Sequence, residues 1–441
     1  MLTGARLCCR VALAVALLGG CKSAGDGLGL QSSTGASARA AVPTPMSGGN
    51  PFGAPDTLPP TIPVGFLVLP AAVSLTATSL SFSPDGSRLY VASLGGFVFA
   101  CPVIGGLLAV PPLPFLSNLS QPLGVLATEH GVFVSVAQGG MGAVLRARDT
   151  NGDFMADVTE VVISGLPIGR HNTNGLALGP DGMLYVLNGS SSDSGFHAEG
   201  GPAETPPYSG SLLRLDPLAT NLTPTPAMVV ATGFRNPYDL AFVPANHPAL
   251  APGQIAVSMN GPDGESYAQA DGSTIARPEG EDTLSLLDPS NGVVEHFGFP
   301  WCVYDRNNGG LAGFTQDAAE GACNPLPAKA FGALAGPGVQ AHPIALFGSH
   351  VSANGLAFNP GTNFPAEYAG DLFVAYFGNN PGETFVGHKV VRVRFGAAGE
   401  VSAIEDFMTS LLPLDLTFGP DGALWIADLS GLILRVSSLG P

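Results

Sequence analysis

The stretch Leu80–Ser93 has the sequence LSFSPDGSRLYVAS and joins two short apolar runs through a Pro-Asp-Gly turn. Proline presets φ and glycine accepts positive φ, so Pro-Asp-Gly favours a tight turn. Alternation such as Leu-Tyr-Val is typical of half-buried strands. The stretch therefore predicts a β-hairpin. The same unit occurs at Leu176–Gly189 (LALGPDGMLYVLNG) and at Leu416–Asp428 (LTFGPDGALWIAD).

Looser copies of this hairpin occur at Gly124–Gln138, Leu240–Gly261 and Leu356–Gly378. The six copies start near residues 80, 124, 176, 240, 356 and 416, at spacings of 44, 52, 64, 116 and 60. Most spacings suit a four-stranded propeller blade, which takes roughly 40–50 residues. We therefore predict an all-β fold, a six-bladed β-propeller over residues 61–441, with a long insertion at 262–345 in the fourth-blade region. A strand around Gly65–Ala77 is expected to close the ring against the last blade.

The composition narrows the class of protein. The 441 residues include 60 Gly and 40 Pro, and hydrophobic residues make up 45%, which excludes a wholly disordered chain. Asp and Glu (34) outnumber Lys and Arg (17), for a net charge of −17. A nucleic-acid-binding protein normally carries a basic surface, so we exclude nucleic acid as a partner. We expect a monomer.

The first 21 residues have the features of an export signal. Arg6 and Arg10 precede the apolar run Val11–Leu18, which is too short to span a bilayer. The run ends Leu-Gly-Gly-Cys21 and resembles the lipobox of bacterial lipoproteins, which implies cleavage before Cys21 and lipid attachment to it; an ordinary signal peptide with a chance cysteine is the alternative. Without the leader the charge is (17 − 2) − 34 = −19. Residues 22–60 predict a flexible tether, and we expect lipid anchoring in a bacterial envelope, on its periplasmic or extracellular face.

Three cysteines remain after the leader and the lipid site. In an oxidising compartment Cys302 and Cys323 are suited to pair across a Gly/Asn-rich excursion. Cys101 is left over and is expected to be a buried small hydrophobe.

The segment Asp149–Glu160 (DTNGDFMADVTE) carries oxygens at the spacing of a calcium loop. Its candidate metal ligands are Asp149, Asn151, Asp153, Asp157 and Glu160. Phe154 replaces the usual glycine, and the flanking segments predict strands instead of helices. Two interpretations of this segment remain open, a loop that binds a structural calcium ion and a solvated acidic turn. Glu160 could also belong to the following strand and not be a ligand.

Several blocks carry a family resemblance. They are Gly169–Gly195 around a Gly-Arg-His-Asn loop, Gly233–Phe242 with its Arg-Asn-Pro, Ser258–Glu265, Glu281–Cys302, Ala353–Gly378, Gly387–Val393 and Pro413–Val436. In this order and spacing they resemble the glucose/sorbosone dehydrogenase family, over roughly residues 75–437. The resemblance implies a six-bladed propeller that uses pyrroloquinoline quinone (PQQ) and calcium to oxidise a sugar or polyol.

The resemblance also implies roles for single residues. His171 matches the family's general base, which takes the hydroxyl proton as hydride moves to the quinone, and histidine is neutral near pH 7 as this role requires. Arg235 and Asn236 match the pair beside the cofactor, with Arg235 also counted as catalytic, and an arginine fork suits carboxylates. Lys389 is placed with the cofactor-binding residues. The backbone carbonyls of Gly261 and Pro262 match the ligands of the cofactor-site calcium.

Two departures from the family keep other functions open. Leu412 stands where many relatives carry a basic residue, and Phe377–Gly382 replaces a more polar fifth-blade motif. Both remove groups suited to PQQ carboxylates. The alternatives are a catalytically inactive surface propeller that binds a glycan or a protein, and a calcium-dependent lactonase, which would need acidic and Asn ligands that converge at the centre.

Overall fold

The computed structural model describes residues 60–73, 75–109, 112–195, 207–264, 266–268, 272, 274–276, 279–306, 312–313, 326, 338–379 and 386–440. In this part of the chain the elements are β-strands and two short 3-10 helices, η1 (Pro226–Met228) and η5 (Ala366–Tyr368). No helix in the described part is long and apolar enough to cross a membrane. The predicted leader, Cys21 and nearly all of the tether lie outside the described residues.

The strands form sheets that follow one another along the chain, each named here by its first strand. The β2 sheet holds β2 (Ala77–Phe82), β3 (Arg88–Ser93), β4 (Phe97–Ile104), β5 (Leu107–Leu108) and β6 (Leu113–Leu116). The β7 sheet holds β7 (Gly124–Thr128), β8 (Gly131–Gln138), β9 (Met141–Arg148) and β10 (Val158–Leu166). The β11 sheet holds β11 (Thr173–Leu178), β12 (Leu184–Asn188), β13 (Ser211–Leu215) and β14 (Val229–Thr232), extended by β20 (Val294–His296) and β23 (Gly338–Gln340).

The later sheets follow the same order. The β15 sheet holds β15 (Asn236–Phe242), β16 (Ile255–Asn260), β19 (Asp282–Leu287) and β24 (Ala345–Gly348). The β25 sheet holds β25 (Ala353–Phe358), β26 (Leu372–Tyr376), β27 (Lys389–Phe395) and β28 (Val401–Thr409). The β29 sheet holds β29 (Pro413–Phe418), β30 (Leu424–Asp428), β31 (Leu432–Ser438) and β1 (Phe66–Val73). Two hairpins stand apart, β17 (Ser266–Ala268) with β18 (Thr274–Ala276) and β21 (Cys302–Val303) with β22 (Ala312–Gly313).

The repeated hairpin forms the strand that names each of these six sheets and the strand that follows it. In the Leu80–Ser93 copy, the carboxylate of Asp85 accepts hydrogen bonds from Ser83 Oγ and from the backbone N–H of Ser87. Gly86 takes a φ of +69°, which a side chain would strain. The Pro-Asp-Gly turns predicted from the sequence therefore connect antiparallel strands as expected.

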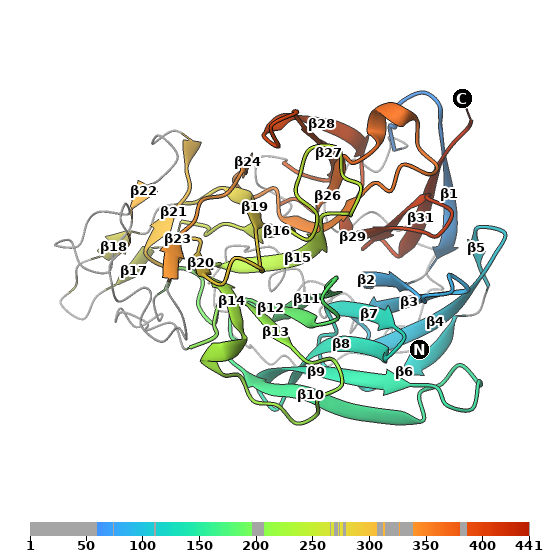
Figure 1. Ribbon diagram of the computed structural model, residues 1–441, viewed down its shortest axis with the longest axis horizontal. Coiled ribbons are helices and arrows are strands. Elements are labelled where there is room, and N and C mark those ends of the chain that lie inside the picture. The colour runs from blue at the N-terminus through green and yellow to red at the C-terminus, as the bar shows by residue number, and fades with distance from the viewer. Residues whose placement is uncertain are drawn as a thin grey trace, which may run out of the picture.

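The first strands contact one another in a closed ring, in the order β2, β7, β11, β15, β25, β29 and back to β2. They lie near the middle of the molecule, whereas β6, β10 and β28 lie at its periphery (Figure 1). Polar side chains bond neighbouring first strands to one another. Asp415 on β29 accepts from the N–H of Leu80 on β2 at 2.7 Å, and Asp239 on β15 accepts from that of Leu356 on β25 at 3.1 Å. The N–H groups of Val125 and Ala127 donate to Oγ of Ser79 and of Ser81, so contacts advance together along β2 and β7 and these two strands run in the same direction. The all-β class and the propeller arrangement are confirmed.

The N-terminal strand β1 pairs antiparallel with β31, so strands from the two ends of the domain complete one sheet. This confirms the closing strand predicted around Gly65–Ala77. The range 262–345 is more mixed than a single excursion: β19 belongs to the β15 sheet, while β20 and β23 extend the β11 sheet in parallel register.

Candidate functional site

His171 lies in the loop before β11, and 1% of its surface is exposed. Its Nδ1 lies 3.0 Å from the carbonyl oxygen of Ser190, so Nδ1 carries the proton and donates it there. Nε2 is buried and has no hydrogen-bond partner among the described residues. Burial lowers the pKa of His171 well below its usual value, and the positive charges of Arg235 and Arg170 lower it further. The ring is therefore neutral, and Nε2 is a buried acceptor.

Arg235 stands directly before β15, and its side chain is fully buried. Its guanidinium pairs with the carboxylate of Asp193, donates from Nε to the carbonyl of Asp193 at 3.2 Å, and lies 3.5 Å from the carboxylate of Asp263. Burial opposes the charge, but the two carboxylates outweigh it and raise the pKa of Arg235. Because the charge of Arg235 also acts on His171, the structure brings these two predicted residues together.

Four further ionisable residues belong to this site and were missed by the sequence reasoning: Arg170, Asp193, Asp263 and His350. Arg170 lies 3.7 Å from Asp193 and 3.6 Å from Asp263, and His350 lies 3.8 Å from Asp263. Burial raises the pKa of Asp263 to about 8, although the charge of Arg235 opposes this. In a chain with only 12% charged residues, Arg170, Asp193 and Asp263 inside the matched blocks were the available signal.

Four buried asparagines form a chain of hydrogen bonds across the first strands at this end. Asn174 donates to Asn236 at 2.9 Å, Asn236 to Asn260 at 3.1 Å, and Asn260 to Asn354 at 3.3 Å. Asn236 thus lies beside Arg235 as predicted, but its amide is held between two other amides. Each accepting oxygen already receives a neighbour's N–H, so this chain orients the site more readily than it supplies metal ligands.

Gly261 and Pro262 lie among backbone oxygens. A Cβ on Gly261 would come 2.5 Å from the carbonyl oxygen of Glu281 and 2.6 Å from that of Gly280. The carboxylate of Asp282 accepts from the N–H of Gly261 at 2.8 Å, and burial raises the pKa of Asp282 to about 6. Backbone oxygens suit a hard cation. The described part of the chain contains no group of three or more His, Cys, Asp or Glu side chains placed to hold a metal ion.

Two residues are not brought to this site in the way a cofactor would need. Lys389 was predicted to bind the cofactor, but its ammonium pairs at 2.6 Å with Asp406 on β28, the outermost strand of its sheet. Leu412 is buried in an apolar cluster drawn from several sheets, which we call the axial cluster. Its buried members are Leu123, Tyr238, Phe377, Leu412, Leu414 and Leu429. Lys389 is thus paired with a carboxylate in this structure, and its role in cofactor binding stays a prediction.

The residues predicted to bind calcium in the acidic loop make hydrogen bonds and ion pairs with the protein itself. Asp149 accepts from the N–H groups of Gly152 and Phe154 at 2.6 and 3.0 Å. Glu160 lies on β10 and pairs with Arg146 and Arg148. The other three predicted ligands, Asn151, Asp153 and Asp157, also bond within the loop. These oxygens close turns within the loop, as a solvated acidic turn would, and the calcium ion stays a prediction.

The cysteines follow the predictions where the structure describes them. Cys101 is buried and free, as expected. Cys302 is buried and disulfide-bonded. Cys323 lies outside the described residues, so its pairing with Cys302 stays a prediction.

A β-propeller with a buried charged site where its first strands begin is the class that fold and geometry define. A family model described as a domain of unknown function (DUF7133) matches residues 113–233. No curated protein sequence matches the chain.

Solved structures match nearly the whole propeller. The calcium structure of an AA12 carbohydrate-active enzyme from Trichoderma reesei is 19% identical, with a TM-score of 0.64, over 86% of this chain and 97% of the other. The holo PQQ domain of pyranose dehydrogenase from Coprinopsis cinerea is 17% identical, with a TM-score of 0.63, over 87% and 98%. The soluble aldose sugar dehydrogenase of Escherichia coli in its apo form is 17% identical, with a TM-score of 0.57, over 85% and 99%. The chain therefore has a β-propeller fold like that of glucose/sorbosone dehydrogenases, which confirms the resemblance at the level of fold.

Proposed function

We propose that this protein oxidises a hydroxyl group of a sugar or polyol, using PQQ and calcium. The observation that carries the proposal is His171 Nε2, a buried and neutral acceptor without a partner among the described residues, beside two guanidinium groups. A neutral imidazole held by its other nitrogen is suited to take a proton from a hydroxyl group. The sugar dehydrogenases of the same fold support the choice of substrate.

The residues present include a candidate base and candidate ligands for calcium. Arg170 and Arg235 would hold the carboxylates of the cofactor, and the carbonyls of Gly261 and Pro262 would hold calcium. When bound, PQQ supplies the two-electron acceptor. His171 orients toward Ser190 through Nδ1 and leaves Nε2 for the substrate proton. Asp193 and Asp263 fix Arg235, and Asn236 acts on the site through the asparagine chain.

The test adds PQQ and Ca²⁺ to the purified protein, follows cofactor binding by absorbance and fluorescence, and assays dye reduction over a panel of sugars and polyols. We expect binding and turnover in the parent, and His171→Gln to lower turnover at least 100-fold while cofactor binding persists. His130→Gln is the matched control, since His130 lies at the Glu129 turn outside the site. Absence of PQQ binding to the folded parent would overturn the proposal.

A second candidate is a propeller that binds a glycan without catalysis. It is favoured by Leu412, which lies in the axial cluster, and by Lys389, which is paired elsewhere. Both leave fewer cations for a tricarboxylate cofactor. Calorimetric binding of cell-wall oligosaccharides in the absence of PQQ and calcium, with no turnover when both are added, would favour this candidate over oxidation.

We also propose six blades and anchoring at the cell envelope. The closed ring of six first strands supports the blade number. The lipobox-like sequence before Cys21 supports anchoring on the periplasmic or extracellular face. Replacing Cys21 with Ser is expected to release the protein from the membrane fraction, and retention there would contradict the anchor.

A further inference from the structure

A second concave site lies at the opposite end of the first strands from His171. It is a cavity of about 550 Å³ lined by the second halves of these strands and the turns that follow them. The Asn chain joins the beginnings of strands β11, β15 and β25, whereas the cavity is reached by their ends. We call it the distal cavity. Nothing in the proposed oxidation uses it.

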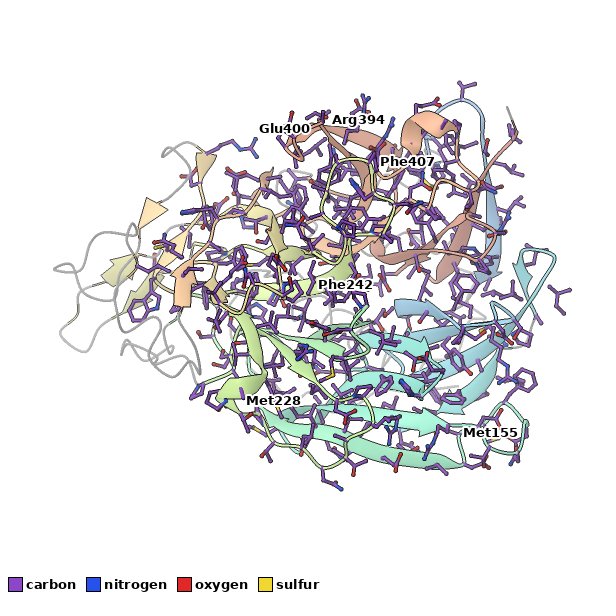
Figure 2. The ribbon with its side chains drawn as sticks, in the orientation of Figure 1. Met155, Met228, Phe242, Arg394, Glu400 and Phe407 are labelled. Atoms are coloured by element: carbon purple, nitrogen blue, oxygen red, sulfur yellow. The ribbon has the colours of Figure 1, made fainter. Side chains whose placement is uncertain are left out.

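The walls of the distal cavity are polar and apolar in nearly equal measure, and the apolar part is rich in large side chains. Phe242, Phe358, Phe418, Leu126 and Leu178 line it, and Phe242 lies near the middle of the molecule, far from the peripheral Met155 and Met228 (Figure 2). Pro84 and Glu129 also line it and are exposed, so the cavity opens to solvent. A volume of several hundred Å³ lined by aromatic side chains and a few polar groups is typical of a small-molecule site.

Two carboxylates line the same cavity, those of Asp239 and Asp415. Asp415 accepts from the N–H groups of Leu80 and Leu416, both at 2.7 Å, and Asp239 accepts from Leu356. Within the described ranges no Lys, Arg or His lies at ion-pair distance from either carboxylate. Burial raises the pKa of both groups, and the charge of Asp415 raises that of Asp239 further. Carboxylates in such a place need a proton or a cation.

A buried hydroxyl group lies next to one of these carboxylates along the chain, in the axial cluster. Tyr238 is 3% exposed, and its OH has no hydrogen-bond partner among the described residues. Burial is the main cause that raises the pKa of this phenol, and the charges of Asp415 and Asp239 raise it further. Tyr238 does not line the distal cavity, so the cavity and its two carboxylates alone define the site.

We propose that the distal cavity binds an amphiphilic organic cation, with a primary ammonium group between Asp239 and Asp415 and a short alkyl or aryl chain against the phenylalanines. An ammonium group needs only a few acceptors, and its chain can lie against Phe242, Phe358 and Phe418, which line the cavity. A calcium ion would need six to eight oxygen ligands. Several carboxylate oxygens here already accept backbone N–H groups, so the cavity suits the organic cation better than the metal.

The first test needs no variant. Hexylammonium chloride is titrated into the full-length protein at pH 7 by calorimetry, beside hexan-1-ol as the neutral match, and beside KCl and CaCl₂. We expect one hexylammonium per chain and at least tenfold weaker binding of hexan-1-ol. Equal binding of amine and alcohol, no binding of either, or displacement of the amine by Ca²⁺ at equimolar concentration would overturn the proposal.

The second test removes one charge. Asp239→Asn keeps an oxygen that can accept from the N–H of Leu356, and it is expected to weaken hexylammonium binding at least tenfold while the affinity for hexan-1-ol stays within threefold. Asp181→Asn is the matched control, because Asp181 is a surface carboxylate paired with Arg214. Unchanged hexylammonium affinity in folded Asp239→Asn protein would contradict the proposal. Should this variant fail to fold, the comparison of amine with alcohol on the parent still decides it.

Discussion

The two ends of the first strands treat buried carboxylates in opposite ways. At the His171 end, Asp193 and Asp263 face the guanidinium groups of Arg235 and Arg170. In the distal cavity, Asp239 and Asp415 face backbone N–H groups and apolar side chains. The axial cluster contains Tyr238 and Leu414, the residues directly before these two aspartates. Strand β15 thus begins at the compensated Arg235 site and carries an uncompensated carboxylate, Asp239, further along.

The largest loss of stability is expected when the positive charge that neutralises the buried carboxylates at the His171 end is removed. Arg235→Met leaves Asp193 and Asp263 buried with one fewer cation, so the free energy of unfolding should fall by about 3–5 kcal/mol. Urea unfolding followed by circular dichroism measures it. Arg214→Met is the control, because Arg214 forms a surface pair with Asp181 and should cost less than about 1 kcal/mol. Equal losses of unfolding free energy in the two variants would mean that burial of the Arg235 ion pairs does not contribute to their effect on stability.

A second prediction uses the pH dependence of the distal cavity. Burial raises the pKa of Asp415 to about 6 from a reference value of 3.8. Between these values the folded chain binds more protons than the unfolded chain, so stability falls as pH rises from 4 to 6 and the contribution of Asp415 is level above that. Asp415→Asn should flatten this part of the profile of urea midpoints measured between pH 4 and 7.

The control for the pH profile has the opposite sign. Hydrogen bonds from Ser83, then from the backbone and side chain of Ser87, lower the pKa of Asp85 to about 2. Its stabilisation is present above pH 4 and is lost as pH falls toward 2, so Asp85→Asn should change the profile only there. An unaltered slope between pH 4 and 6 in Asp415→Asn would show that the cavity carboxylates are not the source of the dependence.

A third prediction sharpens the geometry around His171. A Cβ on Gly189 would come 2.5 Å from Cβ of His171 and 2.9 Å from the carbonyl oxygen of Asn172. Gly189→Ala should therefore destabilise the protein by about 1–3 kcal/mol through overpacking. The NMR resonances of the His171 ring should shift as well. Gly95→Ala, whose Cβ would meet nothing closer than 3.4 Å, should leave both the urea midpoint and these resonances unchanged.

The sequence predicted the repeating unit well because that unit is local. Pro-Asp-Gly turns and alternating apolar residues specify a hairpin within about fourteen residues, and β1 pairing with β31 follows from ring closure. The sites depend on contacts between sheets. Arg170 and Asp263 are distant in sequence but only 3.6 Å apart. Lys389 and the Asp149 loop illustrate this, because linear spacing does not show that Asp406 or a backbone N–H lies within bonding distance of each charge.

The smallest expected effect compares one phenylalanine from each end. Phe234 directly precedes Arg235, is fully buried and stacks on Phe297 with ring centroids 4.7 Å apart. Phe242 lines the distal cavity, is half-buried and meets Tyr185 edge-on at 5.1 Å. Phe234→Leu should cost about 2 kcal/mol of unfolding free energy because the lost volume leaves a void. Phe242→Leu should cost less than about 1 kcal/mol, because its lost contacts border space that is already open. Urea unfolding of the pair decides it: equal costs would mean that the cavity is closed in solution, and the contrast between the two ends would then rest on charge alone.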